Sequence, residues 1–388
     1  MKYELMDMCS DNAVIKVIGV GGGGGNAVEH MMEHQIDGVE FSCANTDAQA
    51  LRRLNVDTKI QLGVELTKGL GAGTKPEVGK LAAEENREHI KEIIDGADMI
   101  FLTAGMGGGT GTGAISVIAE IAKELGVLTV AVVTKPFDFE GKKKKMVAEQ
   151  GISELEKQVD SLIVIPNQKL LPVLGSNLSL VNAFKAANDV LLDAVQGITE
   201  LITHPGLINV DFADVKTIMS NMGTAIMGSG SAVGDNRAKE AAEKAIACPL
   251  LEDINLEGAK GILVNISAAD MDLTEFDEIG SIMHAFATED ADMKIGTTIN
   301  PDMGDEIKVT VVATGMGIDM EAAIDRSPTV KLVQKAIAGD INYDVLDKPT
   351  IQRKSKQDSR ETRFGAQPKN EMDLDYLDVP AFLRRQAD

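Results

Sequence analysis

The sequence has 388 residues, of which 44% are hydrophobic, and a formal net charge of −22. That length suffices for two ordinary domains, and the acidity argues against a protein that holds nucleic acid by electrostatic attraction. Three scattered cysteines, an acidic N-terminus and the lack of a long apolar run argue against a disulfide scaffold, a signal peptide and a membrane span, so we expect a cytoplasmic protein.

The first half of the chain alternates short β-branched apolar segments with helical ones. We expect strands at residues 14–20, 39–44, 99–102, 128–133 and 161–165. This alternation is typical of a parallel sheet that is covered by helices on both faces. Ligands of such sheets bind at the carboxyl ends of the strands.

Two glycine-rich segments follow strands of this pattern. Five consecutive glycines at 21–25 precede a helix that we expect to begin at Asn26, and residues 105–113 read GMGGGTGTG before a helix expected at 114–125. Glycine lets backbone N–H groups approach an anion closely, and a helix N-terminus adds unpaired N–H groups and a positive dipole end. Together the segments predict a cradle for one polyphosphate, although neither matches the P-loop pattern.

Three other polar segments each allow a plain structural interpretation and a functional one. Asn45, Thr46 and Asp47 follow the second strand and either form a turn or contact a ligand. Residues 69–77 form another glycine loop, which is either a surface turn or a sensor of the terminal phosphate. The basic run at 142–145 is either a solvated helix face or a contact to phosphate or sugar.

A long helix is expected at 178–203, about 39 Å in length at 1.5 Å per residue. Phe184, Asn188 and Asp189 lie near its start, where they either fill the core or hold a nucleotide base. A carboxylate accepts two N–H donors, and guanine presents N1–H and the N2 amino group side by side. The base-holding interpretation therefore favours GTP over ATP.

The chain after the long helix predicts a second, smaller α/β domain. Strands are expected at 261–267, 293–299 and 307–313, with a helix at 273–287. Asn209, Asp211 and Asp214 precede this domain, where the acids either cap a helix or polarise a water molecule. Because a full helix separates them from the base contacts, they cannot reach the nucleotide of their own chain, and another molecule would have to complete the site.

The predicted organisation has six parts. They are a flexible N-terminus (1–12), a nucleotide-binding domain (13–177), the central helix (178–204), the second α/β domain (205–317), a disordered linker (318–371) and a terminal peptide (372–388). The linker is poor in apolar residues, whereas the terminal peptide interleaves apolar anchors with acidic residues, as docking peptides do.

Two other site types also match local patterns. The residues from Gly19 to Gly24 satisfy G-x-G-x-x-G, and Asp47 follows at the distance expected of a dinucleotide-binding oxidoreductase, but that interpretation leaves residues 105–113 unexplained. The segment from His30 to His34 matches H-x-x-E-H, a zinc-protease pattern, without an evident third ligand, so we expect no protein-bound metal. A nucleotide-binding scaffold without hydrolysis is a further alternative.

Taken together, the motifs resemble the FtsZ family of tubulin-like GTPases. GMGGGTGTG is similar to the family's phosphate signature, and the other matching segments occur in family order: GGGGGN at 21–26, NTD at 45–47, GAGTKPE at 71–77, TKPFDFEG at 134–141, FKAAND at 184–189, NVDFAD at 209–214 and YLDVPAFLRRQAD at 376–388. The similarity extends over nearly the whole chain.

The resemblance implies a GTP or GDP site, with Mg²⁺ as a companion ion. Its nucleotide contacts would be Gly21, Gly22, Gly23, Gly24, Gly25, Asn26, Asn45, Thr46, Asp47, Ala72, Gly73, Gly107, Gly108, Gly109, Thr110, Gly111, Thr112, Thr134, Glu140, Lys144, Phe184, Asn188 and Asp189. The glycine segments would hold the phosphates and the long-helix residues the guanine. Many relatives carry Arg where Lys144 stands, and Lys cannot make the bidentate contact that Arg can.

The resemblance also implies how the protein works. Asn209, Asp211 and Asp214 would enter the site of the next subunit and activate the attacking water. The protein would be a GTPase that polymerises head to tail as the scaffold of the ring at the division site. Residues 373–385 would bind membrane-adaptor and regulatory proteins, with no nucleic-acid partner and no direct membrane insertion.

Overall fold

The computed structural model of the chain describes residues 13–174, 179–204, 206–220, 223–248, 250–251, 259–287 and 291–316. All of them belong to the first of the chain's two structural units. The expected flexible N-terminus, the linker and the terminal peptide lie outside the described residues.

One ten-stranded sheet runs through the described chain, in the order β3-β2-β1-β4-β5-β6-β7-β10-β8-β9. Strands β1 to β6 are parallel, whereas β10 is antiparallel to both β7 and β8. The bounds are β1 (Ile15–Val20), β2 (Val39–Asn45), β3 (Thr58–Gln61), β4 (Met99–Gly105), β5 (Leu128–Lys135), β6 (Ser161–Pro166), β7 (Thr224–Val233), β8 (Gly261–Ala268), β9 (Asp292–Ile299) and β10 (Glu306–Met316).

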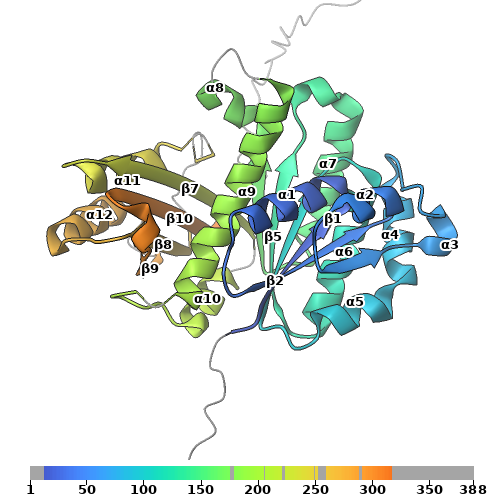
Figure 1. Ribbon diagram of the computed structural model, residues 1–388, viewed down its shortest axis with the longest axis horizontal. Helices are drawn as coiled ribbons and strands as arrows, with labels where there is room; N and C mark the ends of the chain where they lie inside the picture. Colours follow the sequence, from blue (N-terminus) through green and yellow to red (C-terminus); the bar gives the residue numbers. More distant parts are fainter. Residues whose placement is uncertain are drawn as a thin grey trace, which may run out of the picture. The chain divides into compact units, whose positions relative to one another are not determined.

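Helices cover both faces of the parallel strands (Figure 1). Side chains alternate along a strand, so Phe101 of β4 packs into one core with α1 and α9, while its neighbour Leu102 packs into another with α4 to α7. The helices are α1 (Gly21–Glu33), α2 (Ala48–Arg53), α3 (Val64–Thr67), α4 (Pro76–Glu85), α5 (Arg87–Ile94), α6 (Gly109–Glu124), η1 (Asp138–Glu140), α7 (Lys142–Leu155), η2 (Asn167–Leu170), α8 (Leu171–Leu174), α9 (Leu180–Thr203), α10 (Phe212–Met219), α11 (Arg237–Ile246), α12 (Leu273–Phe286) and η3 (Pro301–Met303).

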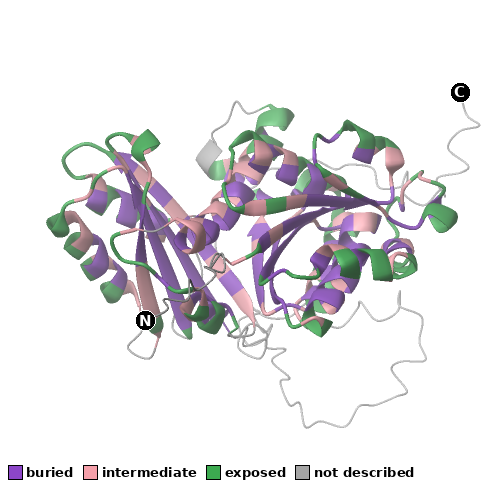
Figure 2. Cartoon of the chain, turned by 60° about the horizontal axis from the view of Figure 1, so that its bottom comes forward, coloured by how far each residue is buried: buried purple, intermediate pink, exposed green. Residues whose placement is uncertain are grey.

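The expected fold class is confirmed, a mostly parallel sheet followed by a long helix and a smaller α/β part. The buried strands of both parts appear purple in Figure 2, beneath a partly exposed layer of helices. The register places Val20 of β1 beside Ala44 of β2 and Ala104 of β4. The carboxyl ends of these strands therefore meet at one edge of the sheet, where both glycine segments lie.

The helices after the two glycine segments begin earlier than predicted. Helix α1 starts at Gly21 instead of Asn26, and α6 starts at Gly109 instead of residue 114. Close packing explains why glycines occupy these first turns. A Cβ on Gly24 would lie 2.3 Å from the carbonyl oxygen of Thr103, and one on Gly113 would lie 1.9 Å from that of Pro76.

The two expected domains share the sheet instead of standing apart. Among the described residues, two pairs join β6 to β7, Leu162 with Thr224 and Ile163 with Ala225. A third hydrophobic core forms between β7 to β10 and the helices α11 and α12. Helix α9 runs between the two parts (Figure 1). Its expected first residue, 178, lies outside the described chain, and Ser179 is its N-cap.

Candidate functional site

A cavity of about 360 Å³ opens at the carboxyl edge of the parallel strands. Its walls come from the first turns of α1 and α6, the ends of β4 and β5, the segment around η1, and α9. The lining residues are Gly22, Gly23, Asn26, Gly73, Gly105, Met106, Gly108, Gly109, Thr110, Gly111, Thr134, Pro136, Glu140, Lys144, Asn167, Phe184, Ala187, Asn188 and Leu191.

Two helix N-termini meet at this cavity. Gly21 and Gly107 have φ values of 72° and 98°, which only glycine adopts without strain, and each lets the chain turn from its strand toward the helix. Within the described chain, no side chain caps either helix at its N-cap, Val20 or Gly108. Apart from the Gly109 N–H, which donates to the Gly73 carbonyl oxygen, the N–H groups in the first turns of the two helices are thus available to one anion. Phosphate-binding sites use this arrangement.

Threonine hydroxyls brace the second glycine segment. Thr112 is buried, and its Oγ1 accepts a hydrogen bond from the Gly107 N–H at 2.8 Å. The Oγ1 atoms of Thr46 and Thr110 lie 2.6 Å apart. Thr110 lines the cavity, while Thr46 and Thr112 support it from behind.

The remaining polar residues after β2 also make local contacts. The Asn45 side chain accepts a hydrogen bond from the Asp47 N–H at 3.2 Å. Asp47 caps α2 by accepting from the N–H groups of Gln49 and Ala50. Neither residue lines the cavity, so their predicted contact with GTP stays a prediction, and the structure supplies the capping role instead.

The loop after β3 closes the cavity on another side. The Gly109 N–H donates to the Gly73 carbonyl oxygen at 2.8 Å, which fixes this loop against the start of α6. Gly73 lines the cavity, whereas Ala72 is buried behind it. The contact of both residues with a terminal phosphate stays a prediction.

Glu140 and Lys144 face the cavity and pair with each other. Lys144 donates to Glu140 Oε2, and the Phe137 backbone N–H donates to Glu140 Oε1 at 2.9 Å. The carboxylate is 14% exposed, so this pair is screened less than a surface ion pair. The two residues could therefore present one charged group to a sugar or phosphate.

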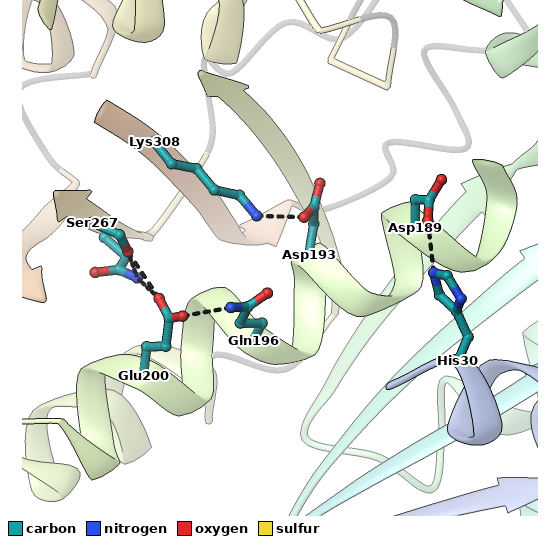
Figure 3. A network of polar contacts seen from close by, with 8 residues as sticks. His30, Asp189, Asp193, Gln196, Glu200, Ser267 and Lys308 are labelled. Carbon is teal, nitrogen blue, oxygen red and sulfur yellow. Dashed lines mark hydrogen bonds and ion pairs between the residues drawn. The ribbon is translucent and has the colours of Figure 1, made fainter. Parts of the chain in front are cut away.

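Helix α9 carries two stripes of residues that face different cavities. Phe184, Ala187, Asn188 and Leu191 follow helical spacing and line the site cavity. Asp189 lies on the next stripe, which lines a second cavity of about 620 Å³. Its Oδ1 lies 2.6 Å from Nε2 of the buried His30 (Figure 3). The structure thus brings Phe184 and Asn188 into the site but not Asp189.

Asn167 is a lining residue that sequence reasoning missed. It is 4% exposed, and in the described chain its Oδ1 has no hydrogen-bond partner, which is costly for a buried polar atom. A ligand that donates a hydrogen bond would satisfy it. Asn167 directly follows β6, so the rule that flagged Asn45 after β2 would have found it. Pro136, Ala187 and Leu191 line the cavity and were not predicted as contacts either.

The predicted catalytic residues follow the C-terminal end of α9, whereas Phe184 and Asn188 lie toward its N-terminal end. Asn209 accepts a hydrogen bond from the Gly206 N–H at 2.8 Å, and Asp214 forms an ion pair with Lys294 at 3.3 Å. Asp211 is exposed at the N-cap of α10, yet its side chain makes no capping hydrogen bond within the described chain. None of these three residues is among those that line the cavity.

The histidine and dinucleotide patterns have structural explanations. The rings of His30 and His34 lie 4.4 Å apart, and among the described residues no group of three His, Cys, Asp or Glu could hold a metal ion. A Cβ on Gly19 would lie 2.4 Å from the Gly24 carbonyl oxygen, so this glycine allows the strand and helix to pack closely.

Comparison with known families identifies the family of the chain. Residues 14–175 match the GTPase domain of the Tubulin/FtsZ family, and residues 223–317 match the C-terminal domain of the FtsZ family. The chain belongs to the FtsZ family of tubulin-like GTPases. The resemblance seen in the sequence is thereby confirmed, and the cavity lies in the part of the chain that matches the GTPase domain.

Similar proteins match over the full length. The cell division protein FtsZ of Coxiella burnetii is 59% identical over 99% of both chains, and that of Pseudomonas aeruginosa is 56% identical over all of both. Among solved structures, an FtsZ dimer from M. jannaschii superposes with a TM-score of 0.75 at 45% identity, over 78% of this chain and 88% of that one. A search of the described helices finds none that is long and apolar enough to cross a membrane.

Proposed function

We propose that the chain binds GTP in the cavity, hydrolyses it and assembles head to tail. The phosphates would lie against the first turns of α1 and α6, and the base would stack on Phe184. Asn188 and Asn167 would hydrogen-bond the edge of the base, since an amide both donates and accepts. The geometry therefore supports recognition of guanine by these amide side chains more directly than by the carboxylate of Asp189.

Mg²⁺ would bind chiefly through the nucleotide. Glu140 is the one carboxylate among the lining residues of the described chain, and it is engaged by Lys144. Mg²⁺ keeps several water ligands and often binds through substrate phosphates, so a site with few carboxylates suits it. The ion would neutralise phosphate charge during hydrolysis.

The proposal of assembly rests on the distance between the residues that would contact the base and the acidic residues. Asn188 and Thr203, the last residue of α9, are fifteen residues apart, or about 22 Å along the helix axis. A group that activates water must come within about 3 Å of it. The acids of one chain would therefore serve the cavity of another.

Exposed apolar side chains flank both halves of such a shared site. Leu70, in the loop that closes the cavity, is 85% exposed. Leu207, next to the acidic segment, is 73% exposed. A contact between these different surfaces is heterologous, and it continues into a filament when the rotation between subunits does not close. The M. jannaschii FtsZ dimer is consistent with self-association in this family.

We further propose that the filament is the scaffold of the division ring in the cytoplasm, and that residues 373–385 recruit adaptor and regulatory proteins. These residues lie outside the described chain, so the proposal rests on their sequence. Deleting residues 373–388 should leave GTP turnover and assembly unchanged and abolish adaptor binding. Loss of turnover in that truncation would contradict a separable tail.

The rate of GTP hydrolysis against protein concentration, in the presence of Mg²⁺, tests the proposed function. A rate per molecule that rises steeply above a threshold would mean that subunits share the site. A constant rate per molecule would mean that each chain hydrolyses alone. Absence of turnover at any concentration would favour a scaffold that does not hydrolyse GTP, and binding of NADH would favour an oxidoreductase.

A further inference from the structure

Phe137 lies directly behind the aromatic side chain that faces the cavity. It is 1% exposed and is not among the lining residues. Its ring meets that of Phe184 edge to face, with centroids 5.4 Å apart and an interplanar angle of 88°. On another side it stacks on Phe139 at 4.9 Å and 13°. Phe137 is thus the middle ring of three, and Phe184 is the ring that reaches the cavity.

Phe184 depends on such support to hold one orientation. It is 41% exposed and lies near the start of α9, where solvent borders part of its ring. An exposed aromatic side chain has several accessible rotamers, and stacking on a base requires one of them. A buried neighbour that contacts the ring edge reduces the entropy lost when the base binds.

The backbone of Phe137 also contacts the charged pair of residues that lines the cavity. Its N–H holds Oε1 of Glu140, whose other oxygen accepts from Lys144. Both of these charged residues line the cavity. One residue that does not itself reach the cavity therefore joins the aromatic wall to the charged pair.

We infer that Phe137 is a positioning residue for base recognition, which fixes the ring of Phe184 without touching the nucleotide. This inference rests on the proposed function, because it requires a base on Phe184. The phosphate cradle is built from other elements, α1 and α6. Removing the Phe137 ring weakens binding of a nucleotide by about twofold to tenfold, the range typical of one edge-to-face pair, and leaves binding of bare phosphates unchanged.

The test measures the affinity of the full chain for GDP and for inorganic pyrophosphate by calorimetry, below the concentration at which it assembles. Phe137→Leu keeps an apolar side chain in the core while removing the ring. Phe286→Leu is the control, since the half-buried Phe286 packs against the core of the C-terminal part. The expected result is weaker GDP binding for Phe137→Leu alone, with pyrophosphate binding equal in all three proteins.

Three results would overturn the inference. The first is an equal loss of GDP and pyrophosphate affinity in Phe137→Leu, and the second is unchanged GDP affinity in that variant. The third is that adding Phe137→Leu to Phe184→Leu lowers GDP affinity by as much as Phe137→Leu does alone. A positioning role predicts that the double variant binds GDP as Phe184→Leu does. Failure of the proposed function is distinguishable, because Phe184→Leu would then bind GDP as tightly as the wild type.

Discussion

Replacing Asp211 by alanine should stop GTP turnover without preventing assembly. A positioned general base contributes about 10²- to 10⁴-fold to a rate, so turnover should fall by that factor. Folding should be little affected, by about 0.5 kcal/mol or less, because Asp211 is exposed and makes no capping hydrogen bond within the described chain. The variant keeps every residue that lines its own cavity.

Mixing the variant with wild-type protein separates a shared site from a self-contained one. Wild-type chains are held below their assembly threshold, and Asp211→Ala is added until the total concentration exceeds it. In a head-to-tail filament with equal amounts of both, about half of the junctions receive a wild-type acid, whichever chain supplies the cavity. Turnover should then appear, at about half the rate of wild-type protein at the same total concentration.

The control is Asp235→Ala, which removes an exposed carboxylate from the turn between β7 and α11. It should behave as wild type, alone and in mixtures. The reasoning is refuted if Asp211→Ala alone turns over GTP at the wild-type rate. It is also refuted if sedimented filaments contain both chains and the mixture remains inactive.

Three further predictions concern the reactivity of two thiols and the stability of the protein. Burial raises the pKa of Cys43 to about 12, so this thiol should resist alkylation in the folded protein while the half-buried Cys248 reacts, as mass spectrometry would show. The hydrogen bond from Arg237 lowers the pKa of Glu275, so the pair stabilises the fold above the carboxyl's unfolded pKa, and the stability gap between wild type and Glu275→Gln should shrink as acidification passes the folded pKa. Gly228→Ala should cost about 1 to 3 kcal/mol in urea unfolding, because its Cβ would lie 2.1 Å from the Ala245 carbonyl oxygen.

Each of these predictions has its own control and contrary outcome. Cys43 should become reactive once the protein is unfolded, and equal reactivity of both thiols in the folded state would contradict the first. A stability gap between wild type and Glu275→Gln that stays constant through acid pH would contradict the second. Among the described residues, a Cβ on Gly280 would meet only Ile295, at 4.0 Å, so Gly280→Ala should not destabilise the protein, and equal losses at both glycines would contradict the third.

Five of the six strands from β1 to β6 could be predicted, because each contains a short apolar run and is followed by a helix. The four-residue β3, which reads TKIQ, was missed. Strand β7 was missed, since Gly228 and Gly230 interrupt its apolar pattern. A Cβ on Gly230 would lie 2.4 Å from the Ala241 carbonyl oxygen, so these glycines allow α11 to pack against the strand. The packing of α11 on β7 requires glycine at these two positions, and the local sequence pattern does not reveal this packing.

The phosphate-binding half of the site could also be predicted, because glycines beside the start of a helix let backbone N–H groups approach an anion. The base-binding half was not fully predictable. Asn188 and Asp189 are adjacent in sequence, and only the rotation of α9 decides that the first faces the site and the second faces His30. Phe137 lies in the matching segment TKPFDFEG, but that segment alone does not reveal that its ring supports Phe184.

The position of α9 also limits how far its sequence can change. After Lys185 every residue of this helix is at least partly buried. Its polar residues are engaged on both sides (Figure 3): Asp189 contacts His30 of α1 at 2.6 Å, whereas Lys308 of β10 pairs with Asp193 at 2.5 Å and Ser267 of β8 donates to Glu200 at 2.8 Å. A helix on a protein surface usually keeps one face on which substitutions are neutral. In α9, a saturation mutagenesis scan should find such tolerance only in the first turn and a half, and compensating changes should come in pairs with residues of the strands beside it.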